Sequence, residues 1–399
     1  MIQPTLFRLI ENNAVLCVWF YNICMDKFNI LDALDNGDLI IRDLDELDQS
    51  KYQKLPIMDL SSFGDEIVGH LKDIGENVLG DIVNGKVKQP KDLKKVIKKE
   101  TLSHFGIQVK TKKGSKNITK AKDIKAMELS DFAIMSGVLM VINAKLGEII
   151  SREKDIVEFL EVDKQTELKA NFLTLNKIVK DYHHNFDNEK FLTNRELQVL
   201  EIRRNAEHNI LFYKELAEKK VKSFEKGIHM EIDKALGEIQ SRMQFYRLAL
   251  YIYAYSSFLD VVLLENYTTT FIDSVIEDIE NHEDQYIEFY EKASKTVRHM
   301  ADTSGKSAAL KGASSITSGL GKLFGKFKAE KNADKLENSS KSLKEKQTNS
   351  VDDMVNKFSN NKDAGVNDIV DNLKRLDDLY NHQPEIIISE KNVYIKNIE

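Results

Sequence analysis

Apolar residues recur at alternating spacings of three and four through the middle of this chain, which is the pattern of amphipathic helices. The clearest stripe runs for roughly four heptads, with Glu153 as its one polar interruption. It predicts a single long helix whose apolar seam packs against a partner helix or against a second copy of the chain. The seam residues are Phe132, Met135, Leu139, Ile142, Leu146, Ile149, Ile156 and Leu160.

Two further helices are predicted after this one. A second stripe runs from Leu168 to Tyr182 and ends in a sequence rich in turn-forming residues. A third helix is expected from Thr193, because Thr193 and Glu196 have the spacing of a capping box. We expect it to continue past Gly227 as far as Met243. Its apolar positions are Leu200, Ile210, Leu216, Val221 and Phe224.

Residues 245–264 are apolar on nearly every helix face, as expected of a helix at the centre of a bundle. Arg247 and Asp260 leave about twelve uncharged residues between them, which span about 18 Å against a hydrocarbon core of about 30 Å. The prediction is therefore a core helix, with conditional membrane insertion as the alternative. An amphipathic helix with an acidic outer face is expected to follow over residues 271–299.

The distribution of proline supports long helices. Residues 91–383 contain no proline, and proline disrupts a helix by removing a backbone donor and by clashing with the preceding turn. The predicted fold class is mainly α. We expect an elongated antiparallel helical bundle or coiled-coil-like block, with a small N-terminal α or α/β element and a polar C-terminal tail.

Composition divides the chain into five segments. They are a small N-terminal element (1–85), a lysine-rich hinge with a hairpin (86–125), the helical bundle (126–300), a Gly/Lys-rich amphipathic segment (301–330) and a polar helical tail with a terminal hairpin (331–399).

Two places favour β-structure because their apolar residues alternate. The first lies in residues 104–120, with a turn at residues 113–115, and the second in residues 385–398. Residues 63–85 instead keep helical spacing but contain four glycines, which weaken a helix. Close packing against a neighbouring backbone is one reason for such glycines, and exposed flexibility is the other.

Charge is unevenly distributed. The net charge is -6, yet residues 86–125 contain fourteen lysines against three acidic residues. Such a basic element favours an anionic partner: a nucleic acid, an acidic membrane surface or acidic helices of the same protein. Nucleic acid ranks below the others, because the stretch has one aromatic residue, Phe105, for stacking and no arginine for reading bases. The candidate anion-binding residues are Lys94, Lys95, Lys98, Lys99, Lys112 and Lys113.

Residues 304–328 combine glycines at every seventh position, an apolar stripe and five lysines. This combination is typical of an amphipathic helix lying on an anionic membrane. The alternative is a flexible basic linker that docks on the acidic helices. The candidate membrane-contact residues are Lys311, Leu320, Lys322, Phe324, Lys326 and Phe327.

Several motifs of the sequence resemble parts of chemical sites, and none meets the full requirements of one. The acidic turn at 32–43 has Leu34 where a calcium ligand belongs, and the Gly-Lys-Ser at 305–307 has Met300 in place of the first glycine of a phosphate-binding loop. Cys17 and Cys24 lie in an apolar run too short to span a membrane, which indicates buried thiols and a cytoplasmic compartment. The pairs closest to a metal site are His183 with His184, and Asp278 with His282.

The sequence therefore predicts a non-enzymatic helical interaction or scaffold protein without catalytic, cofactor or metal residues. Its partners are expected to be proteins, including itself, and an anionic membrane surface to which it binds peripherally. The alternatives are a nucleic-acid-associated helical protein that uses the lysines of residues 86–125, and a helical membrane-active toxin. The outline resembles helical bundle toxins and helical scaffold proteins in architecture alone.

Overall fold

The computed structural model describes residues 39–85, 97–111, 129–151, 166–225, 232–304 and 362–396. These residues are mostly helical and include one small antiparallel sheet, which confirms the predicted mainly α class. The chain separates into two compact units. The sheet unit contains residues 1–143 and 378–399, and the long-helix unit contains residues 144–377.

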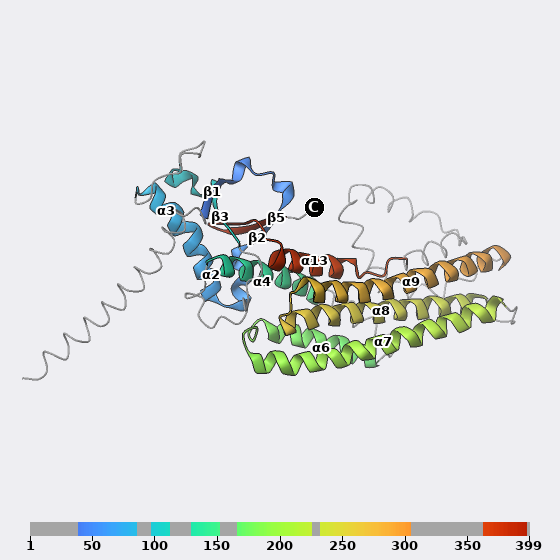
Figure 1. The fold of residues 1–399 in the computed structure, drawn as a ribbon. Coiled ribbons are helices and arrows are strands. Elements are labelled where there is room, and N and C mark those ends of the chain that lie inside the picture. Colours follow the sequence, from blue (N-terminus) through green and yellow to red (C-terminus); the bar gives the residue numbers. More distant parts are fainter. Residues whose placement is uncertain are drawn as a thin grey trace, which may run out of the picture. The chain divides into compact units, whose positions relative to one another are not determined.

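The sheet has five strands in the order β1-β3-β4-β5-β2, and every neighbouring pair is antiparallel (Figure 1). Strands β4 and β5 form a C-terminal hairpin, as their alternation suggested, and this hairpin lies between β3 and β2. All four residues of β4 are buried, which suits a strand near the middle of a sheet. The strands are β1 (Leu39–Asp43), β2 (Tyr52–Pro56), β3 (Phe105–Val109), β4 (Ile386–Ser389) and β5 (Asn392–Lys396).

The sheet differs from the sequence-based picture in which residues pair. Strand β3 was expected to start a local hairpin, but its two edges pair with β1 and with β4. Both partners are distant in sequence, and residues 112–128 lie outside the described part of the chain. The predicted N-terminal element and C-terminal tail thus contribute strands to one sheet.

A short helical layer follows β2 in the sheet unit. Its elements are η3 (Ile57–Phe63, 3₁₀), α2 (Asp65–Lys72), the π-helical turn η4 (Asp73–Asn77) and α3 (Val78–Val83). Gly75 lies against the β4–β5 turn, so that a Cβ added to it would overlap the carbonyl oxygen of Ser389. A Cβ at Gly80 would meet open space. Close backbone packing therefore explains Gly75 and does not explain Gly80. Three more 3₁₀ turns are η1 (Leu44–Glu46), η2 (Gln49–Lys51) and η5 (Lys99–His104).

Long helices build the other unit. Helices α7, α8 and α9 lie side by side, and α6 contacts α7 and α8 (Figure 1). Because α7 and α8 pack against each other, the expected continuation of one helix past Gly227 is wrong. The helices are α4 (Leu129–Ser151, shared with the sheet unit), α6 (Thr166–Tyr182), α7 (Glu189–Glu225), α8 (Ile232–Leu264), α9 (Thr269–Ser304) and α13 (Asn367–Asn381).

The start of α7 is set by an asparagine. Asn188 accepts a hydrogen bond from the backbone N–H of Phe191 at 3.2 Å through its side-chain oxygen, which is the geometry of an N-cap. Thr193, the expected cap, lies inside the helix and donates to the carbonyl of Glu189 at 2.9 Å. The capping-box prediction is therefore wrong, because Asn188 already satisfies the first turn.

Helix α8 provides the core of the long-helix unit, and every residue from Met243 to Leu263 is buried. Among the described residues, two helical stretches are long and apolar enough to cross a membrane, residues 130–150 and 237–264. The tested window of the second stretch is 94% buried within the chain. In this structure it has the surroundings of a core helix, and the core prediction for residues 245–264 holds.

Candidate functional site

Helix α7 exposes apolar side chains on the side opposite to its core contacts. Val199, Ala206 and Tyr213 are buried, whereas Leu197 is 61% exposed and Leu211 is 56% exposed. We call this exposed side the α7 outer face, and it consists of Leu197, Glu201, Arg204, Glu207, His208, Leu211 and Phe212.

The centre of the α7 outer face follows a heptad. Leu197, Arg204 and Leu211 are separated by seven residues each, which places them along one line of a helix. Arg204 lies between Glu201 and Glu207, one helical turn away on either side. The face is therefore a leucine–arginine–leucine line bordered by carboxylates, and such a line suits a helical partner.

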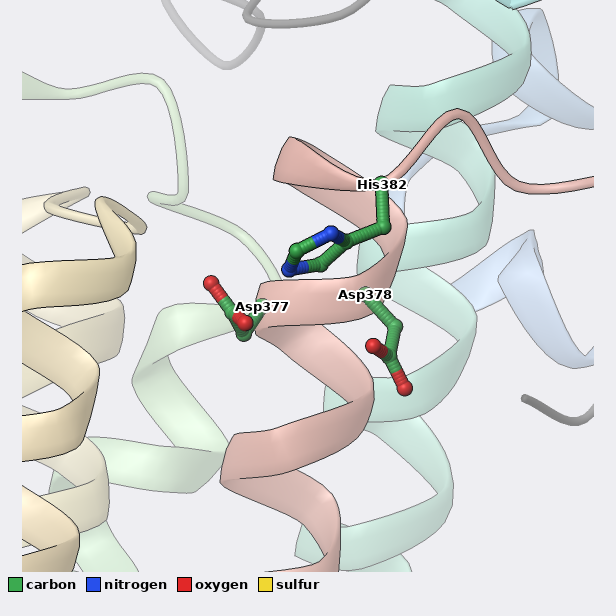
Figure 2. A group of neighbouring side chains, drawn as sticks. All are labelled: Asp377, Asp378 and His382. Carbon is green, nitrogen blue, oxygen red and sulfur yellow. The ribbon is translucent and has the colours of Figure 1, made fainter. Parts of the chain in front are cut away.

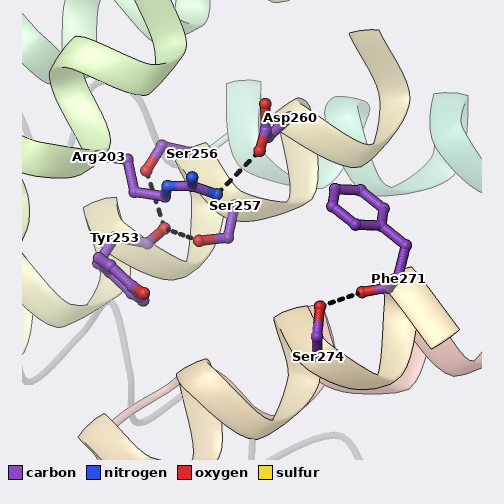
Figure 3. Close-up of polar contacts among 7 residues, drawn as sticks. All are labelled: Arg203, Tyr253, Ser256, Ser257, Asp260, Phe271 and Ser274. Carbon is purple, nitrogen blue, oxygen red and sulfur yellow. Dashed lines mark hydrogen bonds and ion pairs between the residues drawn. The ribbon is translucent and has the colours of Figure 1, made fainter. Parts of the chain in front are cut away.

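A largely buried ion pair fixes α7 to α8. Nη1 of Arg203 donates to Oδ2 of Asp260 at 2.8 Å (Figure 3). Burial raises the pKa of Asp260, and Arg203 counters this only in part. Because a buried carboxylate needs its partner, this pair holds the core side of α7 in place.

Two serines of the same stretch of α8 bond to the backbone of their own helix. The hydroxyls of Ser256 and Ser257 donate to the carbonyl oxygen of Tyr253 at 2.8 and 2.9 Å, one turn back in the helix (Figure 3). In α9, Ser274 donates likewise to the carbonyl of Phe271. The bonds of Ser256 and Ser257 let these two buried serines lie in the interior with their hydroxyls paired, whereas Ser274 is exposed.

A second buried ionic group lies around Arg247. Its side chain is about 1% exposed, and burial lowers its pKa while Tyr286 and Asp363 act in the opposite direction. Glu283 on α9 is also buried, and burial together with Asp363, Asp284 and Glu280 raises its pKa to about 7. Asp363, in the segment before α13, thus acts electrostatically on charged groups of both α8 and α9.

Helix α13 is attached to α9 by further polar contacts. The hydroxyl of Thr269 donates to Oδ1 of Asp377 at 2.7 Å, and Nζ of Lys374 lies 3.7 Å from Oε1 of Glu280. Nδ2 of Asn367 lies 3.5 Å from Oε1 of Glu283. Polar contacts of buried and of exposed residues thus connect α13 with α9.

Two of the histidines considered as metal ligands, His282 and His183, are half-buried among other side chains of the chain. The ring of His282 packs edge-on against Tyr253 with centroids 4.5 Å apart, and burial lowers the pKa of His282. Burial also lowers the pKa of His183, with a smaller effect from His184.

One cluster of metal-ligand type occurs among the described residues, and sequence reasoning missed it. Ligand atoms of Asp377, Asp378 and His382 lie within 4.8 Å of one another at the C-terminal end of α13 (Figure 2). Asp377 already accepts the bond from Thr269, and His382 is exposed. Exposed acidic groups of this kind are common at helix ends, so the cluster supports no metal assignment.

The predicted seam lies inside the chain. Its six described residues belong to α4 and are at most 2% exposed. They are buried within the chain, and their contact with a partner stays a prediction. Ile156 and Leu160 lie outside the described residues. The six buried positions are Phe132, Met135, Leu139, Ile142, Leu146 and Ile149.

The two basic surfaces fall mostly outside the described residues. Of the anion-binding candidates, Lys98 and Lys99 are described, and both are exposed. The remaining anion-binding and membrane-contact candidates lie outside: Lys94, Lys95, Lys112, Lys113, Lys311, Leu320, Lys322, Phe324, Lys326 and Phe327.

The α7 outer face was missed because the apolar residues of α7 occur on several sides of the helix. Leu200 and Leu216, assigned to the core stripe, are half-buried, whereas Leu197 and Leu211 are exposed. The seven-residue spacing of Leu197, Arg204 and Leu211 is the signal that identifies the face.

No family model, curated protein or solved structure matches this chain.

Proposed function

We propose that this chain is a non-enzymatic helical interaction protein that binds another protein through the α7 outer face. The observation that carries the proposal is the exposure of Leu197 and Leu211 at the centre of the outward side of a 37-residue helix. Full burial of a leucine contributes about 1.5–3 kcal/mol. Covering both leucines with an apolar partner surface is therefore favourable.

The core side of α7 supports this role. The Arg203–Asp260 pair and the contacts with α8 hold the helix, so its outer face is preorganised and little conformational entropy is lost on binding. A helical partner with apolar residues at heptad spacing would match the leucine–arginine–leucine line.

A photo-crosslinking amino acid at position 211 of the full chain tests the proposal in cells that express it. We expect a product of higher mass that is lost when Leu197→Glu is added. The control carries the crosslinker at Glu288, which is exposed on α9. No product at position 211, or equal products at both positions, would overturn the proposal.

A membrane-active protein is the second candidate, favoured by the length and apolar composition of residues 237–264. Insertion would require α7 and α9 to leave α8, which exposes their own apolar sides. Dye release from vesicles tests it: we expect release by the full chain if α8 inserts, and retention of the dye if α8 is only a core helix.

Peripheral membrane binding and nucleic-acid binding, both expected from the lysine-rich segments of the sequence, are proposed separately from protein binding by α7. Co-sedimentation with anionic vesicles, lost on combined serine substitution of Leu320, Phe324 and Phe327, would support the membrane clause. A gel shift with DNA, weakened by higher salt and by neutral substitutions of Lys98 and Lys99, would support the nucleic-acid alternative. If the chain neither sediments with the vesicles nor shifts the DNA, both membrane binding and nucleic-acid binding are excluded.

A further inference from the structure

We propose that the partner on the α7 outer face is a second copy of this chain, bound with the two α7 helices antiparallel and the two-fold axis beside Arg204. The inference rests on the proposed function and names the partner of the same surface. A two-fold interface presents one patch to its own copy, so the patch must be self-complementary.

The leucines meet this requirement. Leu197 and Leu211 lie seven residues on either side of Arg204. In an antiparallel pair centred on Arg204, Leu197 of each copy therefore lies opposite Leu211 of the other. Both leucines of both copies are covered by the same arrangement.

The charges near the ends of the patch are also complementary. Glu189 and Lys219 lie at equal distances in sequence from Arg204, and so do Lys190 and Glu218. The antiparallel pairing thus places Glu189 opposite Lys219 and Lys190 opposite Glu218. A parallel pairing would place each of these charges opposite its own copy, which is unfavourable.

Within each helix, two of these charges already have local partners. Lys219 pairs with Glu215 at 2.6 Å, and Glu218 pairs with Lys222 at 3.2 Å. Lys219, Glu215 and Lys222 are exposed and Glu218 is half-buried, and such pairs in contact with water are weak. The second copy therefore adds an opposite charge to each pair without first breaking a strong contact.

The centre of the patch brings the two Arg204 side chains near each other. Glu201 and Glu207 lie three residues before and after Arg204 and are exposed. In the antiparallel pair, Glu201 of each copy lies opposite Glu207 of the other. The two guanidiniums lie between these carboxylates, so that arginine–carboxylate attraction offsets the repulsion among the like charges. His208 is exposed on the same face and lies opposite the half-buried Leu200 of the other copy.

The size of the patch sets the strength of the dimer. From Glu189 to Lys219 the helix is about 45 Å long and about 10 Å wide. The pair would bury about 900 Å² in total, below the roughly 1,200 Å² at which stable specific interfaces begin and in the range of weak, transient ones. We therefore expect a dissociation constant in the micromolar range.

Cysteine crosslinking tests the arrangement in the full chain, with Cys17 and Cys24 replaced by serine. Arg204→Cys is expected to form a disulfide-linked dimer with itself, because it lies on the axis. An equimolar mixture of Leu197→Cys and Leu211→Cys is expected to give at least about tenfold more dimer than either variant alone. Glu288→Cys on α9 is the matched exposed control.

Light scattering on the uncrosslinked protein gives an independent measurement. We expect the mass to rise toward a dimer between about 1 and about 200 µM, and Leu197→Glu with Leu211→Glu to remain monomeric. Circular dichroism of the double variant should be unchanged, because both side chains are exposed.

The outcomes separate this inference from the proposed function. A monomer at every concentration without mixed crosslinks overturns the second copy as partner. Preferential self-crosslinking of Leu197→Cys overturns the antiparallel arrangement. If position 211 nevertheless photo-crosslinks to a different protein in cells, the proposed function stands and this inference fails. If position 211 also gives no product, both fail.

Discussion

Glu283 makes the stability of the long-helix unit dependent on pH. The residue is about 9% exposed, and the pKa of its carboxyl is raised from 4.5 to about 7 by burial first and then by Asp363, Asp284 and Glu280. Between pH 4.5 and about 7 the folded state holds a proton that the unfolded state has lost. The stability associated with this group is therefore complete below pH 4.5 and is lost as the pH rises through about 7.

The magnitude follows from the shift. A change from 4.5 to about 7 corresponds to about 3 kcal/mol at full strength. Asp284 and Glu280 are exposed and Asp363 is half-buried, so water screens part of their effect and about 1–2 kcal/mol remains. Glu283→Gln removes the charge and keeps an oxygen that can face Asn367. We expect the variant to be about 1–2 kcal/mol more stable than the wild type at about pH 8 and nearly equal to it at about pH 5.

Urea unfolding at several pH values between about 5 and about 8, followed by pulsed hydrogen exchange of α9 peptides, measures this difference in the long-helix unit alone. Glu288→Gln, on the exposed side of the same helix, is the control, and its effect should stay within about 0.5 kcal/mol at every pH. The reasoning is refuted if the unfolding midpoint of Glu283→Gln depends on pH as strongly as that of the wild type.

Further substitutions test a close glycine contact, an ion pair and a helix cap. Gly75→Ala should destabilise the sheet unit by about 1–3 kcal/mol, whereas Gly80→Ala should stabilise it by up to about 1 kcal/mol. Hydrogen exchange of β4 and β5 measures both changes in stability. Equal effects of the two substitutions would contradict the packing argument. Arg203→Met should cost about 3–5 kcal/mol at neutral pH by leaving Asp260 buried without its partner. Urea unfolding should show recovery in the double variant with Asp260→Leu, and no recovery would argue against the ion pair. Asn188→Ala should cost about 1 kcal/mol and increase exchange in the first turn of α7; unchanged exchange there would exclude the cap.

Helices were predictable because their signal is local. The stripe from Leu168 to Tyr182 became α6, and the apolar stretch 245–264 became the core of α8. An i to i−4 hydrogen-bond ladder and a 3.6-residue period need no information from distant parts of the chain. The partners of a strand do depend on distant parts of the chain. The local hairpin expected for β3 was therefore wrong, because the strands that pair with β3 lie far from it in sequence.

The candidate surface on α7 likewise combines a local helix pattern with exposure that depends on the rest of the fold. The sequence alone determined that this chain is mainly helical, that residues 245–264 form a core helix and that charge is segregated along the chain. Tertiary structure alone decided that the α4 seam is internal, that Gly75 abuts Ser389 and that Leu197 and Leu211 face outward. The physical reason is that periodicity defines the faces of a helix, whereas the other elements that pack against it decide which face is covered.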